Sequence, residues 1–235
     1  MSTFITTGEK YRLQDGNCLE FVQDDCMENP FLDWNHDGVK FYNCYKYYNL
    51  SEKEYNFRSM DSCLDRMIRD LIPWKFKAQW IDDCLEYGYD KSEVAKVLET
   101  IGRFAYIMPV YAYEHGGITL STGRFADMWD SGQIGWIAIR KADFTHEYLS
   151  KKDRRLNAKA RATKAESMLQ GWIKTIDQYL TGECYGFKVT DKHGNVIGSC
   201  YGFLGSDLET NGILDHIGLT IEEFKRLDTW TEDDE

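Results

Sequence analysis

Apolar and polar residues follow one another along the chain in blocks whose spacing distinguishes strands from helices. Two blocks rich in β-branched and aromatic residues, 104–113 and 134–139, predict strands. The connection between them is about 20 residues long and is rich in glycine and hydroxyl side chains. A polar connection of this length between two apolar strands is more often functional than idle. We therefore expect the loop 114–133 to be displayed on the surface of a rigid body.

A second periodicity, with apolar residues three and four positions apart, predicts helices. Three helices are expected over 59–72, 91–101 and 153–180, and the last is the longest helical segment of the chain. Ser59 and Ser92 occupy the N-cap positions of the first two. A hydroxyl at an N-cap can accept a hydrogen bond from an amide of the first turn, so both residues support these starting points.

Segments in which apolar and polar residues alternate, or that flank a turn motif, predict further strands. The segment 8–23 reads as a hairpin around the turn Asp15-Gly16-Asn17, and the motif G-x-C-Y-G-F at 182–187 and 198–203 predicts a second hairpin. The segment 39–48 has aromatic residues on both faces, which favours a central strand that is covered on both sides. Together these elements predict an α+β fold with a mixed or mainly antiparallel central sheet, several packed helices and one long helix near 153–180.

Length and composition indicate a packed protein. The chain has 235 residues, of which 43% are hydrophobic and 14% aromatic, which is enough to bury a large core. This size allows one domain or two small ones, and we expect a single α+β domain over 1–235. Within it, 1–100 can form an N-terminal subdomain, 101–228 the main body and 229–235 an acidic tail.

The net charge of -11 restricts the partners. Direct nucleic-acid binding requires a surplus of Lys and Arg, so it is not expected. A basic partner fits better, including one whose own task is to hold DNA or RNA. The acidic pairs Asp24-Asp25 and Asp82-Asp83 and the tail 232–235 are the candidate contacts for such a partner.

Positive charge is concentrated in one segment, the first half of the predicted helix 153–180. Lys152, Arg155 and Lys159 represent this basic helix face. It is either a solvated helix surface or a site for an anionic ligand or partner, and the sequence leaves both interpretations open.

Cysteine spacing and the N-terminal residues indicate an intracellular protein. The seven cysteines are odd in number and have no C-x-x-C pair, and 1–5 has no basic or apolar leader pattern, so we expect free thiols in a reducing cytoplasm. No apolar run reaches the length of a membrane span, so no membrane partner is expected.

One segment resembles half of a metal site. The residues DWNHDG at 33–38 match the first half of a calcium loop, but Cys44 stands where such a loop needs a bidentate Glu. An Asx-type turn is the favoured interpretation. No two histidines have ligand spacing on one element, and therefore neither a metal nor another cofactor is predicted.

The loop 114–133 contains the residues best suited to chemistry. His115 follows a strand end and precedes two glycines, and with Asp130 and Ser131 it can supply a base, an orienting carboxylate and a nucleophile. Alternatively, Asp130 and Ser131 close a tight turn and His115 bonds to a backbone carbonyl. The candidate binding residues around them are Glu114, Arg124, Trp129 and Gln133. No complete catalytic motif is present, so enzymatic activity stays open and a non-enzymatic protein is favoured.

Several segments resemble, in order, a widespread family of phage and mobile-element proteins of unknown activity. They are ENPFLDWNHDGVKFYNCYKYYNL, PVYAYEHGGITLSTGRFADMWDSGQIGWIAI, IDQYLTGECYGFKVTD and GSCYGFLGSD, and the likeness covers most of 24–207. This chain has Glu114 where an aspartate is expected before the histidine, and Gly116 where a serine is expected after it. The family supplies no established reaction, so the resemblance implies origin and context only.

The context implied by the resemblance leads to two main hypotheses. The first is a counter-defence inhibitor of the anti-CRISPR or anti-restriction type, which acts in the cytoplasm of a bacterial host. It would bind a host defence protein or nucleoprotein complex through an acidic, nucleic-acid-mimicking surface. The alternative is an enzyme or sponge for a small anionic ligand such as a nucleotide, with a cleft around His115 and Asp130. A structural or regulatory homo-oligomer is a third possibility.

Overall fold

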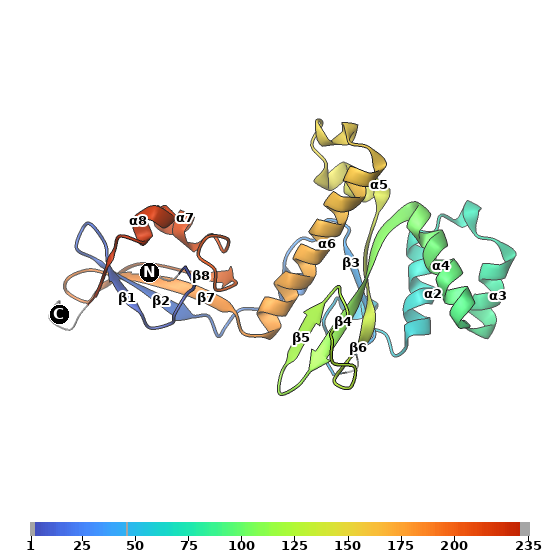
Figure 1. Cartoon of the computed structure of the whole chain (residues 1–235), viewed down its shortest axis with the longest axis horizontal. Helices are drawn as coiled ribbons and strands as arrows, with labels where there is room; N and C mark the ends of the chain where they lie inside the picture. Colours follow the sequence, from blue (N-terminus) through green and yellow to red (C-terminus); the bar gives the residue numbers. More distant parts are fainter. Residues whose placement is uncertain (1–2, 46, 231–235) are drawn as a thin grey trace. The chain divides into compact units, whose positions relative to one another are not determined.

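A computed structural model describes residues 3–45 and 47–230 of the chain. These residues fold into antiparallel sheets with packed helices, which confirms the α+β class (Figure 1). The chain divides into two compact units rather than the single domain expected: unit 1 comprises 1–28 and 178–235, and unit 2 comprises 29–177. Each unit has its own sheet, so the one central sheet of the prediction is replaced by two.

Unit 1 is built from both ends of the chain, and helices cover one face of its sheet. The five strands are β1 (Lys10–Arg12), β2 (Cys18–Gln23), β7 (Cys184–Thr190), β8 (Val196–Leu204) and β9 (Asp228–Thr229). Their order is β8-β7-β2-β1-β9, with every neighbouring pair antiparallel. The helices α7 (Ile213–Ile217) and α8 (Ile221–Phe224) pack against this sheet through a shared apolar core. Both predicted hairpins are therefore confirmed.

Aromatic side chains form the centre of the unit 1 core. Tyr11, Phe21 and Phe224 meet in a cluster whose ring centroids are 5.0 to 5.8 Å apart. The rings of Phe187 and Phe203, from the two hairpin strands β7 and β8, lie 6.2 Å apart. β2 and β7 are neighbours in the sheet although they are distant in sequence. Burial of the aromatic rings on these strands therefore stabilises the packing of the N-terminal segment against the C-terminal segment.

Unit 2 contains a four-stranded antiparallel sheet in the order β3-β6-β4-β5. The strands are β3 (Lys40–Asn43), β4 (Ala105–Glu114), β5 (Ile118–Ser121) and β6 (Ser131–Arg140). The longer helices are α2 (Met60–Leu71), α3 (Gln79–Tyr87), α4 (Lys91–Phe104) and α6 (Ala158–Leu180), of which the last belongs to unit 2 up to residue 177. Shorter turns complete it: α1 (Pro30–Asp33), η1 (Lys53–Tyr55), η2 (Trp74–Phe76), α5 (Lys141–Asp143), a π-helical turn (Phe144–Tyr148) and η4 (Asp153–Arg155).

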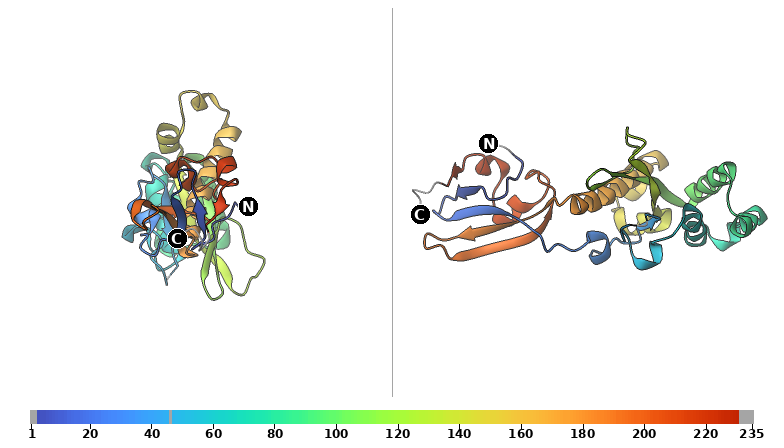
Figure 2. Two further views of the ribbon diagram at one scale, coloured as in Figure 1. Left: turned by 90° about the vertical axis from the view of Figure 1, so that its left-hand side faces the viewer. Right: turned by 90° about the horizontal axis from the view of Figure 1, so that it is seen from below.

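Helices cover both faces of this sheet, as the ribbon views show (Figures 1 and 2). Tyr42 and Trp136 pack with α2 and α4 on one face. On the other face, the ring of Phe31 packs edge to face against two rings. Its centroid lies 6.1 Å from that of Phe41 and 5.5 Å from that of Trp172 in α6. Six consecutive residues of β6, 134–139, are buried, as expected for a strand between two helical layers. The strand 39–48 was predicted to be central, but β3 is shorter and lies at the sheet edge, where the helices nevertheless cover both of its faces.

Local hydrogen bonds explain where the helices begin. The Ser59 hydroxyl accepts from the amide of Ser62 at 3.2 Å, as predicted. The cap of α4 is Asp90 rather than Ser92, because the Asp90 carboxylate accepts from two amides of the first turn and Glu93 completes a capping box. The helix predicted from 153 starts only at 158, because Leu156 is extended, with φ -60° and ψ 147°, and separates η4 from α6.

Two predicted connections have defined structures. Asn35 accepts a hydrogen bond from the amide of Asp37 at 3.1 Å, which confirms the Asx-type turn. The loop 114–133, in contrast, is not a single loop, because its residues 118–121 form β5 and pair with β4. Its irregular parts are therefore a tight turn at 115–117 and a connection over 122–130.

The two units differ strongly in net charge. Unit 1 contains 18 Asp and Glu against 6 Lys and Arg, a net charge of -12, whereas unit 2 contains 21 against 22, a net charge of +1. Four of the unit 1 acids belong to the predicted tail and lie at 232–235, outside the described residues. Across the described residues, every helix is too short or too polar to cross a bilayer.

Candidate functional site

Asp127 accepts the hydrogen bonds that order the end of the connection 122–130. Its carboxylate accepts from the amides of Trp129 at 2.8 Å and Asp130 at 3.4 Å. Its carbonyl oxygen accepts from the hydroxyl of Ser131. These bonds are local, as expected for an Asx-type turn, and they fix the direction in which the following residues leave the loop.

His115 and Asp130 are brought together, as the sequence hypothesis requires. The His115 Nδ1 and Asp130 Oδ2 atoms lie 3.0 Å apart, and the amide of Glu114 donates to the Asp130 carbonyl at 2.8 Å. The side chains are 74% and 41% exposed, respectively. Since a solvent-exposed pair is screened by water, this contact orients the imidazole more than it stabilises the fold.

Ser131 does not complete a nucleophilic arrangement with this pair. Its hydroxyl proton is directed to the Asp127 carbonyl and not to His115. Four pockets among the described residues have volumes of 360 to 430 Å³, and none of these four is lined by His115, Asp130 or Ser131. The arrangement therefore offers an oriented, open histidine rather than an enclosed active site.

The predicted binding residues of this segment have separate partners. Glu114 accepts a hydrogen bond from the Tyr45 hydroxyl, and Arg124 donates to the Tyr111 hydroxyl at 3.3 Å. Gln133 donates to the Gly135 carbonyl at 3.2 Å, so its amide supports the strand. Trp129 is 96% exposed and is the residue most available to a partner.

The acidic pairs lie on different units, and one of them has a structural role. Asp24, in unit 1, accepts from the amides of Cys26 at 3.1 Å and Gly202 at 3.0 Å, and it thereby links β2 to the β8 strand. Asp25 beside it is exposed. Asp82 and Asp83 are exposed on α3 of unit 2, so they belong to a unit with almost no net charge.

The predicted basic face does not lie on one helix. Lys152 and Arg155 flank or belong to η4, while Lys159 belongs to α6, and all three are exposed. Neighbouring cations are used inside the segment: Arg161 donates to the carbonyls of Leu156 and Arg154, and Lys164 pairs with Asp153 at 2.6 Å. Arg161 and Lys164 therefore stabilise the turn before α6, whereas the three predicted residues stay exposed.

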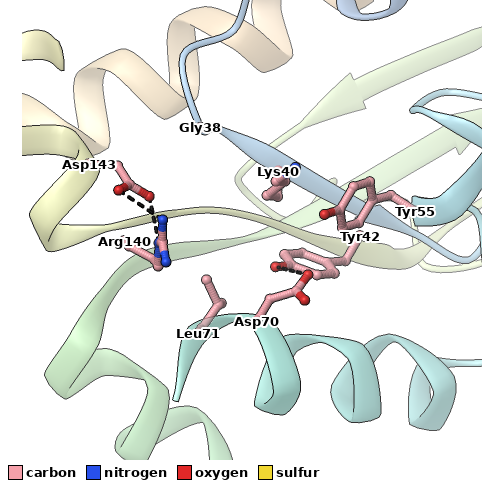
Figure 3. A pocket seen from close by; sticks show the side chains of 8 residues that line it. All are labelled: Gly38, Lys40, Tyr42, Tyr55, Asp70, Leu71, Arg140 and Asp143. Atoms are coloured by element: carbon pink, nitrogen blue, oxygen red, sulfur yellow. Dashed lines mark hydrogen bonds and ion pairs between the residues drawn. The ribbon is translucent and has the colours of Figure 1, made fainter. Parts of the chain in front are cut away.

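A polar pocket that the sequence did not reveal lies beside β3. It has a volume of 370 Å³ and is lined by Lys40, Tyr42, Tyr55, Asp70, Arg140 and Asp143, together with Gly38 and Leu71 (Figure 3). These residues come from β3 and the turn before it, from η1 and α2, and from the end of β6 with the adjoining α5. Their only sequence signal is charge placed at the ends of apolar elements, as at 140–143, and this pattern is too common to identify a pocket.

Other side chains in the described residues offer no alternative centre. No group of three or more His, Cys, Asp and Glu residues is arranged to hold a metal ion there. The seven cysteines are present as free thiols. Comparison with protein-family models, with curated proteins and with solved structures found no match.

Proposed function

We propose that this protein is a binding inhibitor whose acidic unit 1 occupies the basic nucleic-acid groove of another protein. In the setting implied by the sequence resemblance, that protein is a bacterial defence complex such as a CRISPR effector or a restriction enzyme. The observation that carries the proposal is the charge of unit 1, which is -12 while unit 2 has +1.

The physical basis is electrostatic complementarity. A groove that binds nucleic acid presents Lys and Arg to phosphates, and a dense negative surface meets the same cations. Charge of this density also accelerates encounter with a basic partner and repels acidic ones. Unit 1 can present its charge without rearrangement, because its sheet and helices enclose a packed aromatic core. Exposed acids on several of its segments include Asp25, Asp215 and Glu222.

The 122–130 connection offers a second kind of contact, an apolar anchor. Trp129 and Met128 are 96% and 84% exposed, although large apolar side chains are usually buried. Tryptophan is enriched among the residues that dominate protein interfaces. The Asp127 hydrogen bonds hold the backbone of this anchor in place.

An enzyme or ligand sponge centred on His115 and Asp130 is less well supported. The pair is open to solvent and the Ser131 hydroxyl is bound to the Asp127 carbonyl. A site of this kind provides neither exclusion of water nor an activated hydroxyl.

The proposal is tested by competition with nucleic acid. A defence complex is captured with the full chain from bacteria that carry one, then purified and loaded with fluorescently labelled DNA or RNA. Addition of the full chain should displace the nucleic acid, as measured by fluorescence anisotropy. Displacement should weaken between about 0.05 M and about 0.5 M salt, because the contacts are screened. Binding whose strength does not change with salt concentration, or that leaves the nucleic acid in place, contradicts the proposal.

Matched charge variants separate the two units. The unit 1 variant combines Asp25→Asn, Asp215→Asn and Glu222→Gln, and the control combines Asp82→Asn, Asp83→Asn and Glu86→Gln in unit 2. All six residues are exposed. Each variant removes three charges, and the unit 1 variant should weaken displacement by about tenfold. An equal loss in both variants would show that charge acts without regard to its location and would remove unit 1 as the binding surface.

A further inference from the structure

We propose that the pocket beside β3 binds a small organic anion, a carboxylate or a phosphate, with Lys40 and Arg140 as its cationic contacts (Figure 3). The inference concerns unit 2 and is independent of the role proposed for unit 1. It rests on the pairing of charges in the pocket, on its walls and on its size.

The two carboxylates that line the pocket are already compensated. Asp70 accepts from Arg66 Nε at 2.9 Å and from the Tyr42 hydroxyl at 3.2 Å, both through Oδ2. Asp143 accepts from Arg140 Nε at 2.6 Å and from Arg140 Nη2 at 3.0 Å. Each carboxylate thus has a guanidinium partner, and Arg66 also approaches Glu54, outside the pocket, at 3.7 Å.

Lys40 is the charge without a counterion. Its Nζ atom lies 4.4 Å from the centroid of the Tyr55 ring, and within the described part of the chain no carboxylate lies within ion-pair distance of it. Figure 3 shows Lys40 with the Arg140–Asp143 pair on one side and the tyrosine rings on the other. The pocket is lined by two cations and two carboxylates. Because both carboxylates are bonded to guanidinium groups, the half-buried Lys40 ammonium is the cation that is open to an added anion.

The walls of the pocket suit an organic anion rather than a bare ion. The rings of Tyr42 and Tyr55 meet edge to face at 5.4 Å, and Leu71 adds an apolar surface. The Arg66 guanidinium carbon also lies 5.0 Å from the centroid of the Tyr55 ring. Lys40 and Arg66 are thus both attracted to the electron-rich ring of Tyr55. Burial and the Asp70 carboxylate raise the pKa of Tyr42 above its ordinary value, so its phenol stays neutral and keeps donating to Asp70.

The size limits the ligand. A volume of 370 Å³ lies at the lower end of the range of about 300 to 1,000 Å³ found for small-molecule sites. A nucleoside monophosphate or a short carboxylic acid fits this range, whereas an oligonucleotide does not. The charged end would lie between Lys40 and Arg140, and the organic part would contact the tyrosines and Leu71.

Calorimetry on the full chain tests the inference with three probes: inorganic phosphate, adenosine monophosphate and succinate. At least one organic probe should bind and should also raise the melting temperature, because a ligand that binds only the folded state stabilises it. Preference for adenosine monophosphate would identify a phosphate ligand, and preference for succinate a carboxylate ligand. The absence of binding by all three probes would overturn the proposal.

Variants locate the binding in the pocket. Lys40→Met keeps the length of the side chain without its charge and should weaken binding by about tenfold or more, whereas Lys40→Arg should largely retain it. Lys96→Met is the matched control, since the Lys96 ammonium also lies over an aromatic ring, that of Trp80, at 3.8 Å but outside this pocket. Circular dichroism verifies that each variant is folded. Equal weakening by Lys40→Met and Lys96→Met would refute the assignment to this pocket.

Discussion

At the residue scale, the close approach of β3 to β6 leaves no room for a side chain at Gly135. Gly135 has a φ of +153° and pairs with Asn43 of β3. A Cβ atom placed on Gly135 would lie 1.9 Å from the Tyr42 carbonyl oxygen, which belongs to the backbone and cannot turn away. The second glycine of the motif WDSGQIGW is thus required by packing rather than by chemistry.

Gly135→Ala should lower the free energy of unfolding by about 2 to 4 kcal/mol, because it combines a backbone clash with an unfavourable φ. Gly117→Ala is the control, since a Cβ there meets no heavy atom within 4 Å. Urea denaturation followed by circular dichroism measures both variants. Equal stability of the two proteins would show that β3 and β6 can separate at this point without cost.

The cysteines differ in environment and hence in reactivity. A hydrogen bond from Cys63 lowers the pKa of Cys44, while burial, with the nearby Asp24 and Glu183 carboxylates, raises the pKa of Cys184 to about 11. Since the thiolate is the reactive form, alkylation of Cys44 should precede that of Cys184 at neutral pH. Cys184 should react appreciably only as the pH rises toward its raised pKa. Mass spectrometry after timed exposure to iodoacetamide checks the order, and earlier labelling of Cys184 would contradict it.

At the scale of elements, caps and turns decide where each helix begins. The capping box of α4 shows this, because Asp90 and Glu93 exchange hydrogen bonds with each other's backbone amides. Ser92 is one position too late to cap the helix, and its hydroxyl instead donates to the Asp90 carboxylate at 2.7 Å. One side chain therefore organises the entire first turn.

Asp90→Ala should destabilise the protein more than Ser92→Ala. Hydrogen bonds from the amide of Glu93 and from Ser92 lower the pKa of Asp90 below its ordinary value. The contribution of a group whose pKa is lowered by folding is present above the unfolded pKa and is lost as the pH falls through the folded pKa. The stability difference between wild type and Asp90→Ala should thus be largest at neutral pH and shrink in acid. Denaturant titrations across this pH range measure it, and a constant difference would contradict the role of the charge.

At the scale of the whole molecule, the two units differ in charge more than in architecture. Both contain an antiparallel sheet with helices on it, but the 14 acids and 6 bases of the described part of unit 1 contrast with the near balance of unit 2. Like charges repel within a folded unit, so a surplus of this size opposes the compact state of unit 1 at low salt.

Added salt should therefore stabilise unit 1 more than unit 2. Hydrogen–deuterium exchange, measured by mass spectrometry at about 0.05 M and about 0.5 M salt, reports on each unit in the intact chain. Protection of β2 and β7 should increase with salt, whereas protection of α2 and β4 should change little. A uniform response across the chain would show that the surplus charge of unit 1 does not weaken its fold.

Local patterns in the sequence were sufficient to identify many individual elements. The hairpins at 8–23 and 182–203, the strands around 104–113 and 134–139 and the capped helix after Ser59 all follow from neighbours within a few positions. Turn residues, alternation and caps act over such distances, so they can be interpreted without knowing the fold. The free thiols and the oriented His115–Asp130 pair also agree with the sequence reading.

Only the tertiary structure decided how these elements are grouped. β2 pairs with β7 across more than half of the chain, which places both termini in one acidic unit and divides a charge of -11 into -12 and +1. The same long-range packing brings Lys40, Asp70 and Arg140 to one pocket. The residue pattern of each segment records which of its faces is buried, but not which distant segment covers that face. The elements were therefore determined by the sequence, and the units, their charges and the pocket by the contacts that the folded chain makes.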